Sequence, residues 1–298
     1  MSAVVGALVA AVVAAGCSAG GPAEPSSVSA SLSAQAGASG AGATAPGTVP
    51  RPAHVVVVVE ENHSHDQVLG SPDAPYLTAL AAEGASFSAS YAVAHPSQPN
   101  YLALFSGSTQ GLTGDSCPHR YSGATLASEL LAAHLDFAGY AESMPVPGFT
   151  GCTSGDYARK HAPWANYPEL PGTVSRTWAQ WPSDYGQLPT VSFVVPNLQH
   201  DMHDGSVREG DDWLRSNLDG YLAWARSHDS LLVVTWDEDE GTSTNRIPTV
   251  VVGAGVRPGT YGELVDHYRV LRTLEDMYAL PALGESAQRA PIDDIWAR

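Results

Sequence analysis

Five short apolar segments constrain the fold of this chain more strongly than any other feature of its sequence. They occupy residues 54–59, 135–140, 190–195, 230–235 and 248–253. Four of them are rich in Val and Leu and carry no alternating charged residues, whereas 135–140 is a weaker example. A run of this kind is typical of a strand that is buried on both faces of a parallel sheet.

Helical patterns separate these predicted strands. They cover residues 74–83, 99–106, 125–134, 211–226 and 267–278. Strands that alternate with helices indicate an α/β fold, in which a doubly wound, mostly parallel sheet carries helices on both faces. In such folds the site forms at the carboxyl ends of the strands, so the residues that follow each strand are the first candidates for function.

The first residues of the chain differ in composition from the rest. Residues 4–15 are small and apolar over a length too short to span a membrane, which is typical of a secretory signal peptide. The sequence Ala-Ala-Gly-Cys at 14–17 resembles a lipoprotein cleavage site with Cys17 as the lipidated residue. A plain secretory signal cleaved nearby is the alternative. We therefore predict a signal peptide over 1–17 and an exported protein, either a cell-surface lipoprotein or a secreted one.

Residues 18–52 are rich in Ala, Ser, Gly and Pro and carry only Glu24 and Arg51 as charged residues. A segment of this composition cannot bury a core, so we expect a disordered tether. The remaining residues, 53–298, are sufficient for one sizeable α/β domain. We expect this domain to be a monomer.

Charge and cysteine content narrow the function further. The net charge of -17 argues against a basic surface for nucleic acid. It also repels an anionic substrate unless metal ions or a local basic cluster invert the field at the site. Once Cys17 is lipidated or removed, Cys117 and Cys152 remain, which predicts one disulfide. Two buried free thiols are the alternative.

Polar residues follow two of the predicted strands directly. Glu61 and Asn62 come after the first strand, and Asp237 and Glu238 come after the strand at 230–235. Because the carboxyl ends of parallel strands meet at one edge of a sheet, we expect these side chains to converge. Carboxylate and amide oxygens are hard ligands, and adjacent carboxylates repel one another unless a cation lies among them. We therefore predict a metal site; a helix-capping turn and a solvated acidic loop are the alternatives.

A serine precedes the predicted helix at 99–106. The segment HPSQPNY at 95–101 places Ser97 just before Pro99, and proline suits the first turn of a helix. A helix start offers free N–H groups and the positive end of a dipole, where phosphate binds favourably. A serine hydroxyl needs a base or a metal to become nucleophilic, so we predict that a metal activates Ser97 for phosphoryl transfer. The alternative is that Ser97 only caps the helix.

Histidines supply candidate acids and further ligands. His203 and Asp204 belong to a dense polar cluster that follows the strand at 190–195. A histidine in that position is a candidate ligand, or a general acid that protonates the leaving alcohol. His267 begins the last predicted helix and is a candidate for contact with metal or phosphate.

The main basic cluster of this acidic chain lies at residues 157–161. It contains Arg159, Lys160 and His161, which are candidates for contact with phosphate oxygens. A solvated basic turn is the alternative. If the cluster does face the site, it supplies the positive charge that a phosphate ester requires in so acidic a protein.

Several motifs together resemble a known family. They are Glu61-Asn62 and the segments at 95–101, 157–164, 203–206 and 235–239. Over almost all of residues 53–297, the chain resembles the bacterial phosphoesterase family that joins acid phosphatases and phospholipases C, within the alkaline phosphatase superfamily. The resemblance implies an alkaline phosphatase-like fold and hydrolysis of phosphate monoesters. It also makes phosphatidylinositol 3-phosphate a candidate substrate.

The resemblance further implies roles for single residues. Ser97 is expected to be phosphorylated in turnover. From the residue patterns described above, we expect either His203 or His161 to assist the leaving group. The expected substrate contacts are Asn100, Arg159, Lys160, Asp204 and His267. The implied metal ligands are Glu61, Asn62, Ser97, Asp237 and Glu238. This ligand set suits Ca²⁺ or Mg²⁺, whereas added histidines admit Zn²⁺.

Two other functions stay open at this point. A phosphodiesterase or phospholipase C would use the same nucleophile and metal, and a ligand-binding lipoprotein without catalysis would suit the tether and anchor. The expected partner is a small phosphate ester or a phosphoinositide rather than nucleic acid. Contact with a membrane is expected only through a lipid anchor.

Overall fold

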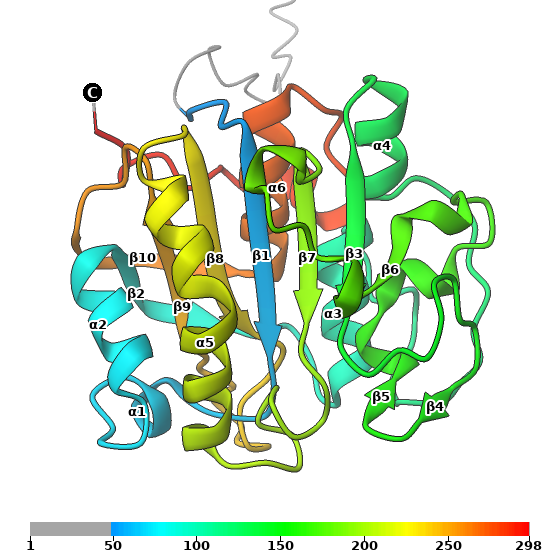
Figure 1. Cartoon of the computed structure of the whole chain (residues 1–298), viewed down its shortest axis with the longest axis horizontal. Helices are drawn as coiled ribbons and strands as arrows, with labels where there is room; N and C mark the ends of the chain where they lie inside the picture. Colours follow the sequence, from blue (N-terminus) through cyan, green and yellow to red (C-terminus); the bar gives the residue numbers. More distant parts are fainter. Residues whose placement is uncertain (1–48, 298) are drawn as a thin grey trace, which may run out of the picture. The chain divides into compact units, whose positions relative to one another are not determined.

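An eight-stranded sheet forms the centre of the computed structural model, which describes residues 49–297 (Figure 1). Its strands lie in the order β10-β2-β9-β8-β1-β7-β3-β6. Strand β9 runs antiparallel to both of its neighbours, and every other neighbouring pair is parallel. The strands are β1 His54–Glu60, β2 Ala85–Tyr91, β3 Phe137–Ala141, β6 Ser175–Thr177, β7 Val191–Val195, β8 Ser230–Trp236, β9 Thr249–Gly253 and β10 Gly259–Asp266. The predicted α/β fold with a mostly parallel sheet is confirmed.

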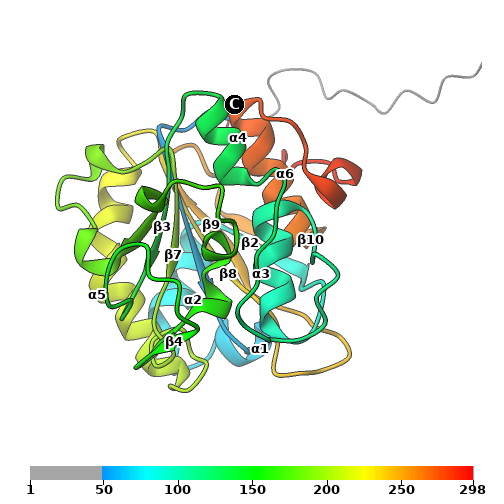
Figure 2. The same ribbon diagram turned by 90° about the vertical axis from the view of Figure 1, so that its right-hand side faces the viewer.

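Helices cover both faces of this sheet. Figure 2 shows the sheet nearly edge-on, with α5 on one side and α3, α4 and α6 on the other. Leu77 of α2 and Leu218 of α5 pack with Val56 on one face, whereas Leu104 of α3 and Leu271 of α6 belong to the core of the opposite face. The helices are α1 His65–Val68, α2 Pro75–Glu83, α3 Ser97–Ser106, α4 Leu126–Ala132, α5 Val207–Ala225 and α6 His267–Tyr278.

Short elements surround the right-hand edge of the sheet in Figure 1. They include a two-stranded hairpin, β4 Thr153–Ser154 with β5 Tyr157–Ala158. Short 3₁₀ helices follow in this region, at η1 Arg159–His161, η2 Pro163–Asn166, η3 Gly172–Val174 and η4 Trp178–Gln180. Two more lie elsewhere: η5 Tyr185–Gln187 beside α5 and η6 Gly284–Gln288 beside α6. A disulfide joins Cys117 to Cys152, as the cysteine content predicted, and so ties the loop after α3 to this region.

Several boundaries differ from the predictions for physical reasons. Helix α5 begins at Val207, four residues earlier than predicted, because Ser206 and Glu209 form a reciprocal capping box. Helix α3 begins at Ser97 rather than at Pro99. Strands β2 and β10 escape the apolar-run criterion, because β2 is rich in Ser and β10 is a partly exposed edge strand.

The predicted signal peptide, the lipidation site Cys17 and almost all of the tether lie outside the described residues. Within 49–297, no helix combines the length and the apolar character needed to cross a membrane. Of the span predicted as one domain, 53–298, the structure describes every residue except the last.

Candidate active site

The polar loops that follow β1, β7 and β8 meet at one edge of the sheet. This is the lower edge in Figure 1, toward which β1 and β7 point. Glu61 follows β1 and donates its main-chain N–H to the carbonyl oxygen of Asp201, from the loop after β7, at 2.8 Å. The N–H of Asp237, which follows β8, donates to Glu60 O at 2.9 Å. Main-chain hydrogen bonds therefore hold the three loops together before any side chain contributes.

Ser97 lies at the centre of this edge. It is the first residue of α3, whose N-cap is Pro96, and its side chain caps nothing. The Ser97 hydroxyl lies 3.0 Å from Glu61 Oε2 and 3.1 Å from Glu238 Oε1. One hydroxyl proton serves only one acceptor at a time, so the second carboxylate oxygen faces a lone pair of Ser97 Oγ. The structure thus brings the serine between carboxylates from two different strand ends.

Glu61 is fully buried beneath this serine. Tyr101 Oη donates to Glu61 Oε1, and His161 Nε2 lies 3.1 Å from the same oxygen. Burial raises the pKa of Glu61 well above its ordinary value, and the charges of Asp237 and Asp201 raise it further. Ionised Glu61 therefore needs a compensating cation in its immediate surroundings.

Asp237, which follows the neighbouring strand β8, is likewise a fully buried carboxylate. Its Oδ1 accepts the N–H of Asn62 at 3.2 Å, whereas Oδ2 accepts no hydrogen bond of normal geometry within residues 49–297. Burial and the neighbouring Glu238 raise the pKa of Asp237 well above its ordinary value, and the Ser97 hydroxyl offsets part of this rise. Asn62 holds a left-handed conformation, φ 58°, which asparagine tolerates better than most residues.

His95 lies beside Glu238 and compensates its negative charge. Its Nδ1 contacts Glu238 Oε2, and its Nε2 lies 3.0 Å from Thr242 O. Partial burial by itself lowers the pKa of His95, but the contacts with Glu238 and Thr242 outweigh it and leave the pKa above its ordinary value. His95 was quoted in the sequence motif but given no role there.

Two further histidines and a lysine face the same region. His161 is buried and places Nδ1 3.1 Å from Asp201 Oδ2. His203 places Nδ1 2.7 Å from Asp204 Oδ1 and Nε2 3.1 Å from Lys160 Nζ. Burial, with Lys160 and His203 nearby, lowers the pKa of His161 well below its ordinary value, so its imidazole is neutral. His161 therefore has a carboxylate oxygen beside each ring nitrogen, whereas His203 has a carboxylate beside Nδ1 and the lysine beside Nε2.

These residues fit a divalent cation. Glu61, His161 and His203 each offer a ligand atom, and the three atoms lie within 4.8 Å of one another. His161 Nε2 and Asp237 Oδ2 are buried atoms without a hydrogen bond of normal geometry among the residues described. Such orphaned atoms are rare in folded proteins and call for a partner. The carboxylates suit Ca²⁺ or Mg²⁺, and the imidazoles suit Zn²⁺.

An open pocket of about 560 Å³ gives access to this edge. That volume lies within the range of small-molecule sites. His161 and Ser97 lie below its surface, whereas His203 reaches its wall. The lining residues are Asn62, His63, His95, Pro96, Met202, His203, Glu238, Asp239, Glu240 and Gly241.

The Phosphoesterase family model matches residues 71–281, most of the described domain. The chain belongs to the Phosphoesterase family. It is 52% identical over 252 residues to the phosphatidylinositol-3-phosphatase of Mycobacterium tuberculosis (strain ATCC 25618 / H37Rv), a match that covers 83% of this chain and 84% of that protein. It is also 30% identical to an acid phosphatase of Aspergillus fumigatus, covering 69% of this chain and only 51% of the longer fungal protein.

Solved structures support the fold of this phosphoesterase. A protein of the alkaline phosphatase superfamily from Vibrio parahaemolyticus matches with a TM-score of 0.57 and 13% identity, over 82% of this chain and 72% of that one. The phosphonate monoester hydrolase SpPMH from Silicibacter pomeroyi matches with a TM-score of 0.53 and 13% identity, over 81% and 78%. At such identities the likeness shows the fold alone. The family match and the sequence relatives make this phosphoesterase a hydrolase acting on phosphate esters.

Arg159 is not free to contact substrate in this phosphoesterase, although the sequence placed it in the basic cluster. Its guanidinium is buried and donates to His119 O at 2.9 Å, to Ala165 O at 2.8 Å and to Thr150 O. Nε donates to Asn166 Oδ1 at 3.2 Å. The physical reason is that three loops cross here and leave carbonyl oxygens that need donors. Arg159 joins these loops, and only Lys160 and His161 of the cluster face the site.

Asn100 and His267 also differ from the prediction. Asn100 Oδ1 accepts the N–H groups of Val93 and Ala94 at 3.1 and 2.9 Å, and its Nδ2 donates to Ala94 O at 2.9 Å. It therefore closes the turn before α3. His267 is buried, and its Nε2 lies 2.9 Å from Trp236 O, so it joins α6 to the end of β8.

Sequence reasoning missed several residues around the site. Tyr101 and Asp201 hold Glu61 and His161, and Asp115 contacts Lys160 Nζ at 3.0 Å. Tyr101 lies one helical turn after Ser97, so spacing along the helix was an available signal. Asp115 lies in an irregular loop, and no sequence pattern points to it.

Proposed function

We propose that this protein is an exported, metal-assisted phosphatase that hydrolyses phosphate monoesters through a phosphoserine at Ser97. The observation that carries the proposal is the position of the Ser97 hydroxyl, buried at a helix start between Glu61 and Glu238. A hydroxyl with carboxylate acceptors on either side is oriented and has a place to leave its proton.

Ser97 Oγ attacks phosphorus and its proton passes to one of these carboxylates. The bond from phosphorus to the leaving alcohol breaks, and His203 supplies the proton that the alcohol oxygen takes up. His203 Nε2 carries that proton once Lys160 Nζ, 3.1 Å away, donates to the substrate phosphate instead. We favour His203 over His161 because His203 lines the pocket, whereas His161 is 1% exposed. Water then attacks the phosphoserine and gives a proton to His203. The Ser97–phosphate bond breaks, Ser97 Oγ takes its proton back from the carboxylate, and inorganic phosphate is released.

Glu61, Asn62, Asp237 and Glu238, with His161 as a candidate, would hold a divalent cation beside Ser97. When bound, such an ion lowers the pKa of a serine hydroxyl and stabilises negative charge on phosphoryl oxygens. Without a cation, the buried carboxylates would repel a phosphate ester. His161 and Asp201 keep Glu61 in place, and Lys160 adds a positive charge at the pocket side.

Phosphatidylinositol 3-phosphate is our leading substrate candidate. The support is the 52% identity to the mycobacterial phosphatidylinositol-3-phosphatase over most of both chains. The pocket is open, so a phosphorylated headgroup enters while the lipid part stays outside. Export, with or without lipidation at Cys17, belongs to the same proposal and rests on the sequence of residues 1–17.

Replacement of Ser97 by alanine tests the mechanism. We expect Ser97→Ala to lower kcat on a chromogenic phosphate monoester by about 10³-fold or more, as loss of a nucleophile does. Acid quench with a radiolabelled monoester should trap phosphoenzyme in the wild type only. Ser106→Ala is the matched control, because Ser106 is a buried serine of the same helix whose hydroxyl donates to Leu102 O at 2.8 Å. Full activity in Ser97→Ala would overturn the proposal.

A substrate panel tests the monoesterase assignment. Phosphatidylinositol 3-phosphate and a chromogenic monoester should be hydrolysed at least about tenfold faster than phosphatidylcholine and a chromogenic diester, judged by kcat/KM. Faster release of phosphocholine from phosphatidylcholine would instead make the protein a phospholipase C.

A further inference from the structure

The loop between α3 and α4 is fastened to the segment that carries Lys160. Besides the Cys117–Cys152 disulfide, Tyr121 N–H donates to Asn166 O at 2.8 Å, and Arg159 donates to His119 O at 2.9 Å. Cys152 O in turn accepts the N–H of Arg159 at 2.9 Å. These contacts fix the position of two segments that are far apart in sequence, and each segment sends one charged side chain toward Ser97.

Those side chains are Asp115 and Lys160. Asp115 Oδ2 accepts from Lys160 Nζ at 3.0 Å, and Oδ1 accepts the main-chain N–H of Gln98 at 2.9 Å. Gln98 is the second residue of α3, next to Ser97. Asp115 therefore occupies one of the free N–H groups at the start of α3 that we expected to bind phosphate. The same carboxylate joins α3 to Lys160.

Lys160 has competing partners in this acidic site. Its side chain is 19% exposed. Burial alone lowers the pKa of Lys160, but Glu61 and Asp115 outweigh it, so the pKa is raised and the ammonium stays charged. A flexible lysine surrounded by carboxylates pairs with whichever lies nearest. Released from Asp115, the ammonium would lose the carboxylate that fixes it beside His203.

We propose that Asp115 is a positioning residue that holds the Lys160 ammonium beside His203, where it binds the phosphate of the substrate. Asp115 Oδ2 accepts one ammonium proton at 3.0 Å. The other two protons, one of which faces His203 Nε2 at 3.1 Å before substrate binds, are free for phosphate oxygens. The proposal rests on the proposed function, since it concerns how that site binds phosphate.

The direction in which phosphate affinity changes when Asp115 is neutralised distinguishes a positioning role from a simple charge effect. Asp115 carries a negative charge near the phosphate site, so removal of that charge by itself would tighten phosphate binding. Loss of lysine positioning would weaken binding. Asp115→Asn is the suitable change, because the asparagine oxygen still accepts from Gln98 N–H while the ion pair with Lys160 is lost.

The experiment measures binding of inorganic phosphate by calorimetry on the full-length, metal-loaded protein, together with KM and kcat on a chromogenic monoester. For Asp115→Asn we expect the phosphate Kd and KM to rise about tenfold, with kcat changed less than about threefold. In a Lys160→Met background the same substitution should add nothing, because Asp115 acts through Lys160. Asp73→Asn is the matched control, since Asp73 pairs with Arg208 at 3.4 Å outside the pocket lining.

An unchanged or tighter phosphate Kd in Asp115→Asn would overturn the proposal. So would an equal loss of affinity in the Lys160→Met background, because that result assigns Asp115 an effect independent of the lysine. Phosphate binding is an equilibrium measurement that needs no turnover. Active Ser97→Ala would therefore defeat the proposed mechanism without deciding the role of Asp115, and the two failures stay distinguishable.

Discussion

Buried carboxylates in two regions of this phosphoesterase differ in whether their oxygens have donors. In α6, Glu275 accepts from Leu283 N–H at 3.0 Å and from Ser286 Oγ at 2.7 Å. At the carboxyl edge of the sheet, Asp237 Oδ2 has no hydrogen bond of normal geometry among the described residues, and neither has His161 Nε2. A buried carboxylate with donors on both oxygens organises the fold, whereas a buried carboxylate oxygen and an imidazole nitrogen without partners at one site fit a cation.

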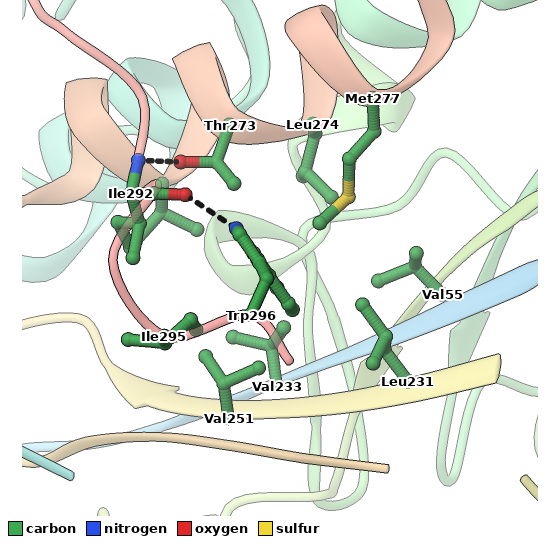
Figure 3. Close-up of a pocket in the computed structure, with 11 residues that line it drawn as sticks. Val55, Leu231, Val233, Val251, Thr273, Leu274, Met277, Ile292, Ile295 and Trp296 are labelled. Atoms are coloured by element: carbon green, nitrogen blue, oxygen red, sulfur yellow. Dashed lines mark hydrogen bonds between the residues drawn. The ribbon is translucent and has the colours of Figure 1, made fainter. Parts of the chain in front are cut away.

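The region around α6 is otherwise an ordinary apolar core. Figure 3 shows the chain end folded back on α6, with Ile292 N–H donating to Thr273 Oγ1 at 2.9 Å and Trp296 Nε1 donating to Ile292 O at 2.8 Å. A small cavity of about 20 Å³ remains between this segment and the sheet. Such a void is lined by apolar side chains and carries no chemistry, in contrast to the acidic edge.

Removal of metal should give the largest difference between the two regions. Chelation is expected to lower kcat/KM by about 10³-fold or more while far-ultraviolet circular dichroism is unchanged, because the core around α6 needs no cation. Added metal at about 100 times its Kd should raise the free energy of unfolding by about 2.7 kcal/mol. Full activity in protein shown by elemental analysis to be metal-free would contradict the comparison.

Asp237→Asn should separate activity from stability. We expect kcat/KM to fall about 10²- to 10³-fold. The metal-free variant should be more stable than metal-free wild type by about 1 kcal/mol, because a buried like-charge contact with Glu238 is removed. The matched control is Asp211→Asn, in which a satisfied carboxylate accepts from Tyr76 and Leu77 N–H at 3.0 and 2.8 Å. That variant should lose stability and keep activity, and equal destabilisation in both variants would refute the distinction.

Glu275 provides a pH test away from the site. Burial raises the pKa of Glu275 from 4.5 to about 7, although Ser286 and Leu283 donate to it. The folded protein therefore binds this proton more tightly than the unfolded chain, and its stabilising contribution is full below pH 4.5 and lost as the pH rises through 7. Glu275→Gln should lack this component, which is on the order of 3 kcal/mol. Parallel stability curves from urea unfolding between pH 4.5 and 8 would contradict the prediction.

The smallest effect concerns the cavity in Figure 3. Val251→Ile adds one methylene group toward a void of about 20 Å³ and should raise the free energy of unfolding by about 0.8 kcal/mol or less. Activity should not change, because Val251 does not line the active-site pocket. A lower melting temperature by calorimetry would mean that the added group is overpacked.

Sequence patterns predict the strands that are buried on both faces and the helices with clear amphipathic spacing. Strands β1 and β8 follow their apolar runs closely, and α6 spans 267–278 as predicted. The strands of the central sheet that the sequence does not predict are β2, β6 and β10. Strand β2 consists mainly of small residues, β6 has three residues and β10 is a partly exposed edge strand, so only pairing with neighbouring strands defines them.

The same distinction applies to the site. Glu61, Ser97 and Glu238 follow apolar segments or begin a helix, so their convergence could be inferred from topology alone. Asp115 and the true contacts of Arg159 depend on the path of irregular loops and on a disulfide. The sequence alone does not distinguish a buried arginine that donates to carbonyl oxygens from an exposed arginine that binds phosphate.

The complete burial of α3 limits which parts of the protein can vary without loss of activity. All ten of its residues are buried, so the segment that bears Ser97 cannot drift without disturbing the interior. By contrast, the tips of the surrounding loops at 122–124, 145–147 and 243–244 are exposed. Altered substrate preference in evolution or in the laboratory should therefore arise by remodelling those loops around an invariant reactive centre.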